Sequence, residues 1–325
     1  MHLVRTTETK HALGSDVTLT LISGLGHAHT TDLLAVLWRQ IYMFERQFSR
    51  FIPMSELMVF NREAGMKTIT SPAFHDLLKA AKYMALKTKG LYNPFILPAL
   101  QRAGYRRSAS PGYENDPQED YTQRQVVTID KLHIGDTWAM IPYNTALDMG
   151  GCGKGYLADQ LAGTLRQYDI AGYWLSLGGD ICSYGADEQG KPLSVAIQNA
   201  QKLDSTRPEY IEQPGDYAAV ATSGTFRRQA QYQTEPWHHI IDPLTGVSAI
   251  TDIQLATVCA TTALEADVLA SCAVIIGADA AVAFLKKNGA TAAYIQYNDT
   301  EGVSRIHQFG LAIVRHSPAK RLSHV

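Results

Sequence analysis

Charged residues are scarce in this sequence, and neither sign predominates. They make up 18% of the 325 positions, with 29 Lys and Arg against 31 Asp and Glu, so the net charge is −2 with histidine neutral. A protein that binds along nucleic-acid phosphates usually carries a basic excess. The charge balance therefore excludes an extended nucleic-acid-binding surface, and the 46% hydrophobic content excludes a disordered chain.

Cysteine is rare as well, with four in the whole chain. No two of them form a Cys-x-x-Cys pair, the spacing typical of zinc ligands and of redox-active pairs. Their wide scatter is equally unlike a disulfide framework. We therefore expect reduced thiols at Cys152, Cys182, Cys259 and Cys272.

No apolar run is long enough to cross a membrane. The most apolar stretch, residues 268–278, is interrupted by Ser271. Asp267 and Asp279 close it off, so it falls well short of the roughly 20 apolar residues that a spanning helix needs. Residues 1–10 contain no apolar segment of the kind found in a secretory signal. A cytoplasmic protein with no transmembrane segment is the default expectation.

Apolar periodicity predicts helices and strands that interleave irregularly. Helices are predicted over residues 31–51, 71–90, 154–167 and 264–276. Strands are predicted near residues 16–23, 126–129, 193–198, 218–221, 256–260 and 293–296. Because no repeat and no regular βαβ array is visible, we expect one α+β (mixed α/β) domain over residues 1–325, with two lobes.

Three segments read as surface excursions rather than as parts of a core. Residues 106–124 and 201–216 are polar and carry turn-forming residues, which is typical of insertions over a surface. Residues 315–325 form a basic tail.

Residues 147–155, with the sequence LDMGGCGKG, form the first segment that points to chemistry. Three glycines in four positions let the backbone approach a polyanion closely, and Lys154 adds a positive charge at a predicted helix start. The segment is neither a Walker A loop nor a dinucleotide-binding GxGxxG loop. The alternative is a tight turn that requires left-handed backbone. A second glycine turn, Gly178-Gly179-Asp180, is in itself an ordinary strand-end turn.

The segment 238–246, HHIIDPLTG, places imidazole beside carboxylate. Such a pair can transfer protons near neutral pH. However, Asp242-Pro243 followed by Thr245-Gly246 is also an ordinary turn signature, so the histidines have a purely structural alternative.

The predicted helix 264–276 carries Asp267 and Ser271 at positions i and i+4, which puts a carboxylate and a hydroxyl on one face. Oxygen ligands of this kind suit Mg²⁺, which takes one or two protein carboxylates and completes its shell with waters and substrate phosphates. The alternative is that Asp267 accepts the N-terminal amides of its helix.

Taken together and in order, these segments resemble the FAD:protein FMN transferase family, also called the ApbE family. The matching motifs are FSRF at 48–51, SEL at 55–57 with Asn61, LD at 147–148, KGY at 154–156 with Asp159, GGDI at 178–181, TSG at 222–224, HIIDP at 239–243 with Gly246, and AD and LAS at 266–271. They extend from near residue 13 to near residue 277, which is most of the chain.

The resemblance implies a two-lobed fold with central sheets flanked by helices and FAD in the cleft between. It implies a Mg²⁺-dependent enzyme that cleaves FAD and transfers FMN to a Thr or Ser hydroxyl of an acceptor protein, releasing AMP. The metal ligands would be Asp267, Ser271 and the carbonyl of Gly151. Lys154 would contact the diphosphate and Asp148 the flavin nucleotide.

The remaining site residues follow from the same resemblance. The backbone of Ile241 would bind the cofactor, and the FAD cleft would be lined by Phe51, Asn61, Leu91, Tyr92 and Asn93. His239 is our candidate base for the acceptor hydroxyl. Asp242 would either orient it or serve only the turn.

The chain departs from the family pattern at several positions. The usual Asp-Pro-Thr is Asn93-Pro94-Phe95, which replaces one acidic FAD contact by an amide, and Ser271 replaces a Thr of the metal helix. The family's acceptor pattern, Asp-x-x-Ser/Thr-Gly-Ala-Thr/Ser, is absent, because residues 288–291 lack its hydroxyl and its upstream acid. Self-modification is therefore not expected.

Two alternative functions stay open at this point. One is a pyrophosphatase that hydrolyses FAD to FMN and AMP, and the other is a non-enzymatic flavin-binding protein. Many relatives are exported, which leaves the cellular compartment open.

Overall fold

The computed structural model describes residues 2–105, 127–200, 209–212, 217–225, 229–232, 235–311 and 313–314. Its central element is an antiparallel sheet of eight strands, in the order β1-β2-β6-β7-β10-β15-β16-β17. These strands are β1 (Val4–Ala12), β2 (Ser15–Ser23), β6 (Gly172–Leu177), β7 (Asp180–Gly185), β10 (Tyr217–Gly224), β15 (Ile253–Ala260), β16 (Ala292–Asn298) and β17 (Ser304–Phe309).

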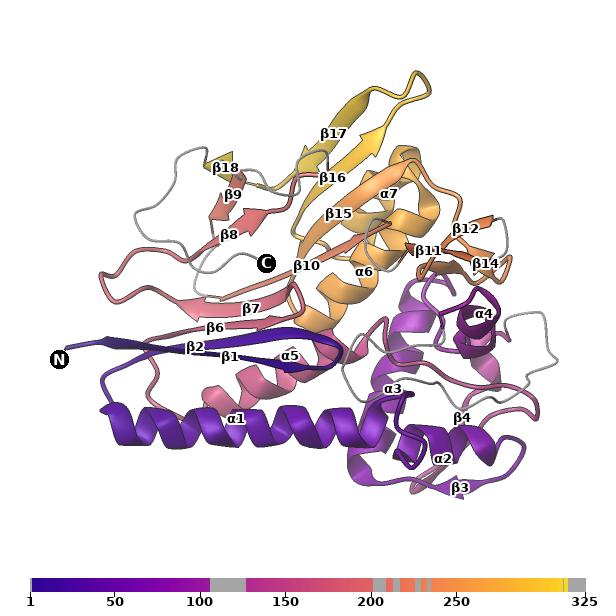
Figure 1. Ribbon diagram of the computed structural model, residues 1–325, viewed down its shortest axis with the longest axis horizontal. Helices are drawn as coiled ribbons and strands as arrows, with labels where there is room; N and C mark the ends of the chain where they lie inside the picture. The colour runs from indigo at the N-terminus through magenta and orange to yellow at the C-terminus, as the bar shows by residue number, and fades with distance from the viewer. Residues whose placement is uncertain are drawn as a thin grey trace.

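One face of this sheet is covered by helices. They are α1 (His27–Phe48), α5 (Gly153–Leu165), α6 (Ala263–Ile276) and α7 (Ala278–Lys287). The helix α1 lies along the β1–β2 end, whereas α6 packs on β10 and β15, and α7 on β16 and β17 (Figure 1). Alternate residues of β2, namely Val17, Leu19 and Leu21, are fully buried in the core between sheet and helices.

A three-stranded sheet covers part of the opposite face. It consists of β8 (Ser194–Ile197), β9 (Glu209–Glu212) and β18 (Ile313–Val314), in the order β18-β9-β8. Val195 and Ile197 of β8 pack against Trp174 and Val220 of the large sheet in a second core. The large sheet is therefore buried on both faces where these strands lie.

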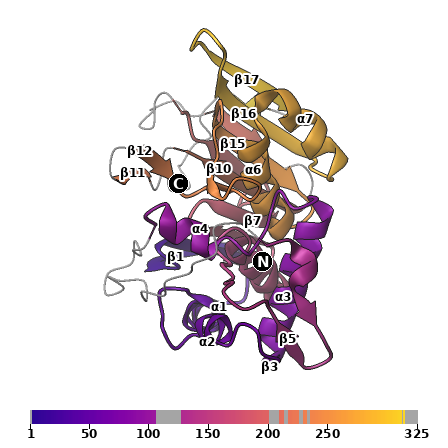
Figure 2. The same ribbon diagram turned by 90° about the vertical axis from the view of Figure 1, so that its right-hand side faces the viewer.

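A second lobe is mostly helical. It contains α2 (Glu56–Arg62), α3 (Pro72–Lys87), α4 (Leu97–Arg102), the 3₁₀ turn η1 (Ile129–Lys131) and a small sheet of β3 (Thr68–Ile69), β4 (His133–Ile134) and β5 (Trp138–Met140). Its core contains Val268 and Cys272 of α6 as well as its own residues. Figure 2 shows this lobe at the opposite end of the molecule from β16 and β17.

Two short hairpins complete the described fold. They are formed by β11 (Gln229–Tyr232) with β12 (Glu235–His238), and by β13 (Ile241–Asp242) with β14 (Val247–Ser248). His239 lies between β12 and β13, directly before the second hairpin.

The mixed α+β class and the main helices are as predicted. Ser71 caps α3, with its hydroxyl accepting a hydrogen bond from the N–H of Phe74 at 3.2 Å, and Pro72 is the first helical residue. The strand predicted at 126–129 is wrong, because residues 127–128 have no regular structure and Ile129 begins η1.

Other predictions concern segments that are described only in part. Within the expected insertion 201–216, Glu209–Glu212 forms the strand β9 and pairs with β8. The insertion 106–124 and the tail 315–325 lie outside the described residues. No helix in the described ranges is long and apolar enough to cross a membrane.

Candidate functional site

A cavity of about 470 Å³ opens between the two lobes. Of the site residues predicted from the sequence, eleven line it: Phe51, Leu91, Tyr92, Asn93, Asp148, Gly151, Lys154, His239, Ile241, Asp267 and Ser271. The fold therefore brings together residues that are more than 200 positions apart in the chain.

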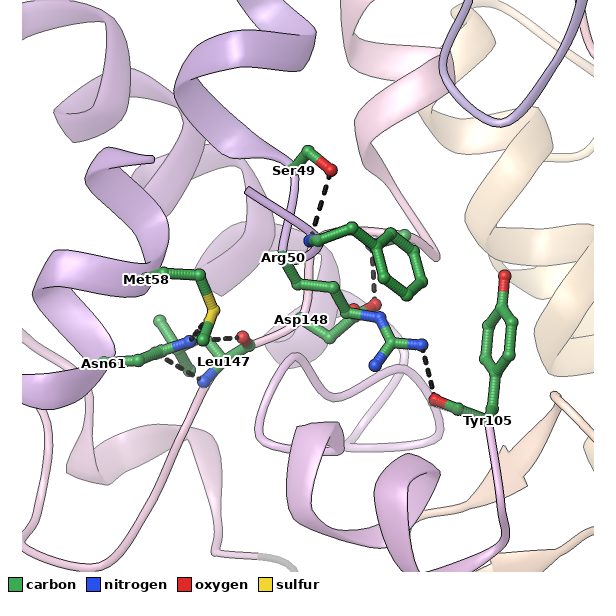
Figure 3. Close-up of polar contacts among 9 residues, drawn as sticks. Ser49, Arg50, Met58, Asn61, Tyr105, Leu147 and Asp148 are labelled. Atoms are coloured by element: carbon green, nitrogen blue, oxygen red, sulfur yellow. Dashed lines mark hydrogen bonds and ion pairs between the residues drawn. The ribbon is translucent and has the colours of Figure 1, made fainter. Parts of the chain in front are cut away.

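Asn61 is the exception, because it is not among the residues that line this cavity. It lies on the inner face of α2 and is 2% exposed. Its side-chain amide donates to the carbonyl of Leu147 at 2.9 Å and accepts from the N–H of Leu147 at 2.8 Å (Figure 3). Asn61 thus fixes the backbone at the start of the glycine loop.

Asn93 lines the cavity, but its amide is held by the backbone of its own lobe. Its nitrogen donates to the carbonyl of Val127 at 2.9 Å, and its oxygen accepts from the N–H of Phe95 at 3.0 Å. The amide that replaces the family's carboxylate thus stabilises the turn that presents Tyr92 to the cavity.

The start of α5 packs directly against α6, and the glycine loop packs against its own Asp148 side chain. A Cβ on Gly155 would lie 2.4 Å from the carbonyl oxygen of Ala263, and one on Gly150 would lie 2.8 Å from a carboxylate oxygen of Asp148. Neither glycine has a positive φ. The alternative of a left-handed turn is therefore wrong for this loop, and the glycines provide space instead.

The close approach of α5 and α6 lets the two helices share a hydrogen bond. The N–H of Gly155 donates to a carboxylate oxygen of Asp267 at 3.1 Å. The N-terminus of α6 itself is satisfied by other groups, because Asp159 accepts from the N–H groups of Ala263 and Leu264 at 2.8 and 2.9 Å. Asp267 therefore accepts an amide of the neighbouring helix rather than of its own.

Residues at four-residue spacing on α6 face the cavity, namely Asp267, Ser271 and Ile275. Asp267 is only 4% exposed. The hydroxyl of Ser271 shares a hydrogen bond with the hydroxyl of Ser223 at 2.9 Å, and Ser223 also lines the cavity. A carboxylate and two hydroxyls are thus presented by α6 and β10.

The donor set at this position fits Mg²⁺ that binds together with a phosphate. In the described ranges, no three His, Cys, Asp or Glu side chains gather as a metal cluster. The available donors are oxygens, from Asp267, Ser271 and the backbone of Gly151. Mg²⁺ accepts one protein carboxylate and takes further oxygens from water and substrate phosphates.

Lys154 forms an ion pair with Asp180, whose side chain is almost fully buried. Asp180 follows Gly178 and Gly179, which have φ of 67° and 106° and form the two-residue turn between β6 and β7. The second glycine turn is thus the strand-end turn expected of it, and it also places a carboxylate beside Lys154. In the cavity, the ammonium of Lys154 is already oriented when an anion arrives.

The two adjacent histidines have different surroundings. His238 has a structural role: its Nε2 lies 2.9 Å from the carbonyl oxygen of Ala249, and its Nδ1 accepts from the N–H of Ile240 at 3.3 Å. Burial lowers the pKa of His238 below its ordinary value, so the ring is neutral with Nε2 donating. His239 instead lines the cavity, with its ring 6.3 Å from that of Tyr105.

Two groups beside the glycine loop stay protonated at neutral pH. Burial raises the pKa of the Tyr92 phenol well above its ordinary value, and the nearby charges of Asp148 and Asp267 raise it further. Burial likewise raises the pKa of the Cys152 thiol to about 12. Tyr92 can therefore donate a hydrogen bond, whereas Cys152 is no nucleophile.

Arg50 occupies the wall of the cavity between Asp148 and Tyr105 (Figure 3). Its Nε lies 3.1 Å from a carboxylate oxygen of Asp148, and its Nη2 donates to the carbonyl of Tyr105 at 2.8 Å. Its guanidinium carbon lies 4.3 Å from the centre of the Phe51 ring and 4.6 Å from that of Tyr105.

Several of these residues are not singled out by sequence reasoning. Arg50 and Asp180 lie inside recognisable motifs, but their partners are 98 and 26 positions away, and no local pattern marks such pairs. Tyr105 stands in no motif at all. Ser223 lies within the TSG tripeptide, which is too common in loops to indicate a function by itself.

Comparisons with known proteins agree on one family. The sequence model described as the ApbE family matches residues 13–295 of the chain. A FAD:protein FMN transferase of Klebsiella pneumoniae is 27% identical over 288 residues, which are 86% of this chain and 81% of the relative. A FAD:protein FMN transferase of Treponema pallidum is 29% identical over 252 residues, which are 72% of this chain and 68% of the relative.

Solved structures show the same fold. The chain resembles the apo form of the flavinyl transferase ApbE of Pseudomonas stutzeri with a TM-score of 0.79 at 20% identity, over 95% of both chains. It resembles the flavin transferase ApbE of Vibrio cholerae with a TM-score of 0.78 at 24% identity, over 94% of this chain and 97% of that one.

Proposed function

The chain belongs to the ApbE family, and we propose that it transfers FMN from FAD to a Thr or Ser hydroxyl of an acceptor protein, with release of AMP. One observation carries the proposal: a single cavity is lined both by a glycine loop with Lys154 and a buried carboxylate, and by aromatic rings beside a histidine. The first set suits a diphosphate, and the second suits the flat rings of a dinucleotide.

The acceptor hydroxyl forms the new bond, to the phosphorus that carries the riboflavin moiety. The bond from that phosphorus to the oxygen of AMP breaks, and AMP leaves with the electron pair. His239 takes the proton of the attacking hydroxyl as general base. The ammonium of Lys154, whether it leaves Asp180 or keeps that ion pair, offsets the negative charge that develops on the diphosphate.

Asp267, Ser271 and the backbone of Gly151 would hold Mg²⁺, in keeping with their oxygen donors and with the cavity that they line. When bound there, the ion would neutralise negative charge on the diphosphate. The hydrogen bond from Gly155 holds the Asp267 carboxylate in one orientation, so the site is arranged before the ion binds.

The hairpin of β13 and β14 favours a transferase over a simple pyrophosphatase. Ile241 and Pro243 line the cavity, whereas Leu244 and Ile250 beside them are 88% and 100% exposed. We take these exposed apolar side chains next to the cavity as part of the surface on which an acceptor protein docks, a surface that water as the acceptor would not need.

The proposal is tested with the full chain, FAD and Mg²⁺, with and without an acceptor domain that carries the family's acceptor pattern. AMP release and the mass of the acceptor are followed together. We expect AMP only when the acceptor is present, with one FMN added to it. A control acceptor, in which the target hydroxyl residue is replaced by alanine, gains no mass.

The other outcomes identify the alternatives. AMP release at the same rate without any acceptor indicates FAD hydrolysis. Bound but intact FAD after long incubation, in the presence of Mg²⁺ and acceptor, indicates a flavin-binding protein and overturns both enzymatic functions.

A further inference from the structure

Arg50 is almost fully buried, and its contacts join three separate segments of the chain. It follows α1 itself, Asp148 precedes α5, and Tyr105 follows α4. The Asp148 carboxylate is shared between Arg50 and the N–H of Gly150, which donates to its second oxygen at 2.8 Å. The guanidinium therefore acts on the conformation of the glycine loop through this carboxylate.

The Arg50 guanidinium also holds the part of the cavity wall that Tyr105 forms. It donates to the Tyr105 carbonyl and lies against the faces of the Phe51 and Tyr105 rings, which stand at 68° to each other. The Tyr105 ring in turn meets the ring of His239 at 70°. A continuous series of contacts therefore leads from the glycine loop through Arg50 to His239.

We propose that Arg50 is a positioning residue for FMN transfer, which holds the glycine loop and the Tyr105 wall at a fixed separation so that the diphosphate and His239 are aligned. The proposal rests on the proposed function. Arg50 acts through Asp148 and Tyr105. It accepts no proton and forms no covalent bond in the reaction.

The chemistry of the side chain explains why arginine stands here. A planar guanidinium can donate in its plane to Asp148 and to the Tyr105 carbonyl while it also contacts the Phe51 and Tyr105 rings. A lysine ammonium is a point charge with no flat face, so it cannot keep both donors and both ring contacts together. The substitution Arg50→Lys therefore keeps the charge but loses the alignment.

The test is a double-mutant cycle of Arg50→Lys and Asp148→Asn, with kcat for acceptor mass gain and the melting temperature measured for each variant. We expect Arg50→Lys to lower kcat by about 10-fold to 100-fold, the effect of a misplacement near 1 Å. If Arg50 acts partly through Asp148, Arg50→Lys lowers kcat by a smaller factor in the Asp148→Asn background than in the wild type. A residue that only stabilises the fold lowers the melting temperature and gives independent, multiplying effects on kcat.

Arg62→Lys is the matched control, because Arg62 also donates to a backbone carbonyl, that of Pro53 at 2.7 Å, but is exposed and does not line the cavity. If Arg50→Lys does not fold, the neutral pair Arg50→Gln with Asp148→Asn takes its place, since it leaves no unpaired buried charge. Wild-type kcat in either variant, or multiplying effects in the cycle, overturns the proposal. An inactive wild-type chain that still quenches flavin fluorescence contradicts the proposed function instead.

Discussion

The backbone N–H of Gly155 donates to the carboxylate of Asp267 at 3.1 Å, across the interface of α5 and α6. Two residues 112 positions apart are thus held together at the point where the glycine loop meets the predicted metal helix. This contact exists only because position 155 has no Cβ.

Gly155→Ala is expected to separate the two helices, because its methyl group would lie 2.4 Å from the Ala263 carbonyl oxygen. Overpacking of this kind costs about 1–3 kcal/mol of unfolding free energy, measured by urea denaturation, and we expect a loss of AMP release with it. Gly163→Ala on the same helix is the control, since a Cβ there meets nothing within 4 Å. It should be neutral or stabilise by up to about 1 kcal/mol. Equal stability of the two variants would contradict the tight contact.

Asp267→Asn is expected to abolish Mg²⁺-dependent turnover while keeping the fold. The amide oxygen can still accept from Gly155, but the charge for the ion is gone, so we expect a loss on the order of 100-fold or more in AMP release. The measurement is a titration of activity with Mg²⁺. Asp279→Asn, at an exposed position in the first turn of α7, should leave the titration unchanged. An unaltered Mg²⁺ response of Asp267→Asn would refute the metal assignment.

His239→Gln is expected to slow FMN transfer by roughly 100-fold to 10,000-fold, the usual contribution of a general base. FAD binding, followed by flavin fluorescence, should change little, because glutamine retains the size and polarity of the side chain. Transfer at the wild-type rate would exclude His239 as the base.

His238 predicts a pH dependence of stability rather than of catalysis. Burial lowers its pKa in the folded protein, so below its ordinary value near 6.5 the unfolded chain binds the proton more readily. We therefore expect unfolding free energy to fall as the pH drops below about 6.5 and to be unaffected by this group at higher pH. His238→Gln should flatten this decline, as measured by urea denaturation between pH 5 and pH 8. A decline that is as steep in the variant would assign it to other groups.

Leu244→Ser together with Ile250→Ser is expected to raise KM for the acceptor without changing the affinity for FAD. Leu244 lies in the turn between β13 and β14 and Ile250 lies two residues after β14, and both side chains are exposed in the segment that follows His239 in the chain. Removal of two apolar contacts corresponds to a KM increase of about 10-fold or more. Ile306→Ser, an exposed apolar residue on β17, is the control. Unchanged KM would show that the acceptor binds elsewhere.

Sequence patterns were sufficient to predict site residues that lie together on a single helix or strand. The four-residue spacing of Asp267 and Ser271 predicted a shared face, and both residues line the cavity with Ile275. The mixed fold class followed from the irregular interleaving of periodic segments. The edge strand β1 was not predicted, because its sequence, VRTTETKHA, is mostly polar. Its contacts with β2 include a hydrogen bond between the hydroxyls of Thr7 and Thr20, which lie 2.9 Å apart.

Pairs that are distant in sequence could not be predicted in this way. The burial of Asn61 depends on how α2 packs, and its hydrogen bonds to Leu147 span 86 positions. The resemblance placed Asn61 in the cleft, whereas the backbone of the loop takes up its amide. Arg50 and Tyr105 belong to the same class, because their contact exists only after α1 and α4 have packed.

The strands of the large sheet are paired in the order in which the ribosome makes them. Each new strand can therefore add to the open edge of those already emerged, and none has to insert between two strands that are already paired. The helix α6 arrives only after β15, so a nascent chain holds Arg50 and Lys154 long before it holds Asp267. The cavity can therefore be completed only after most strands of the sheet that supports it have been synthesised.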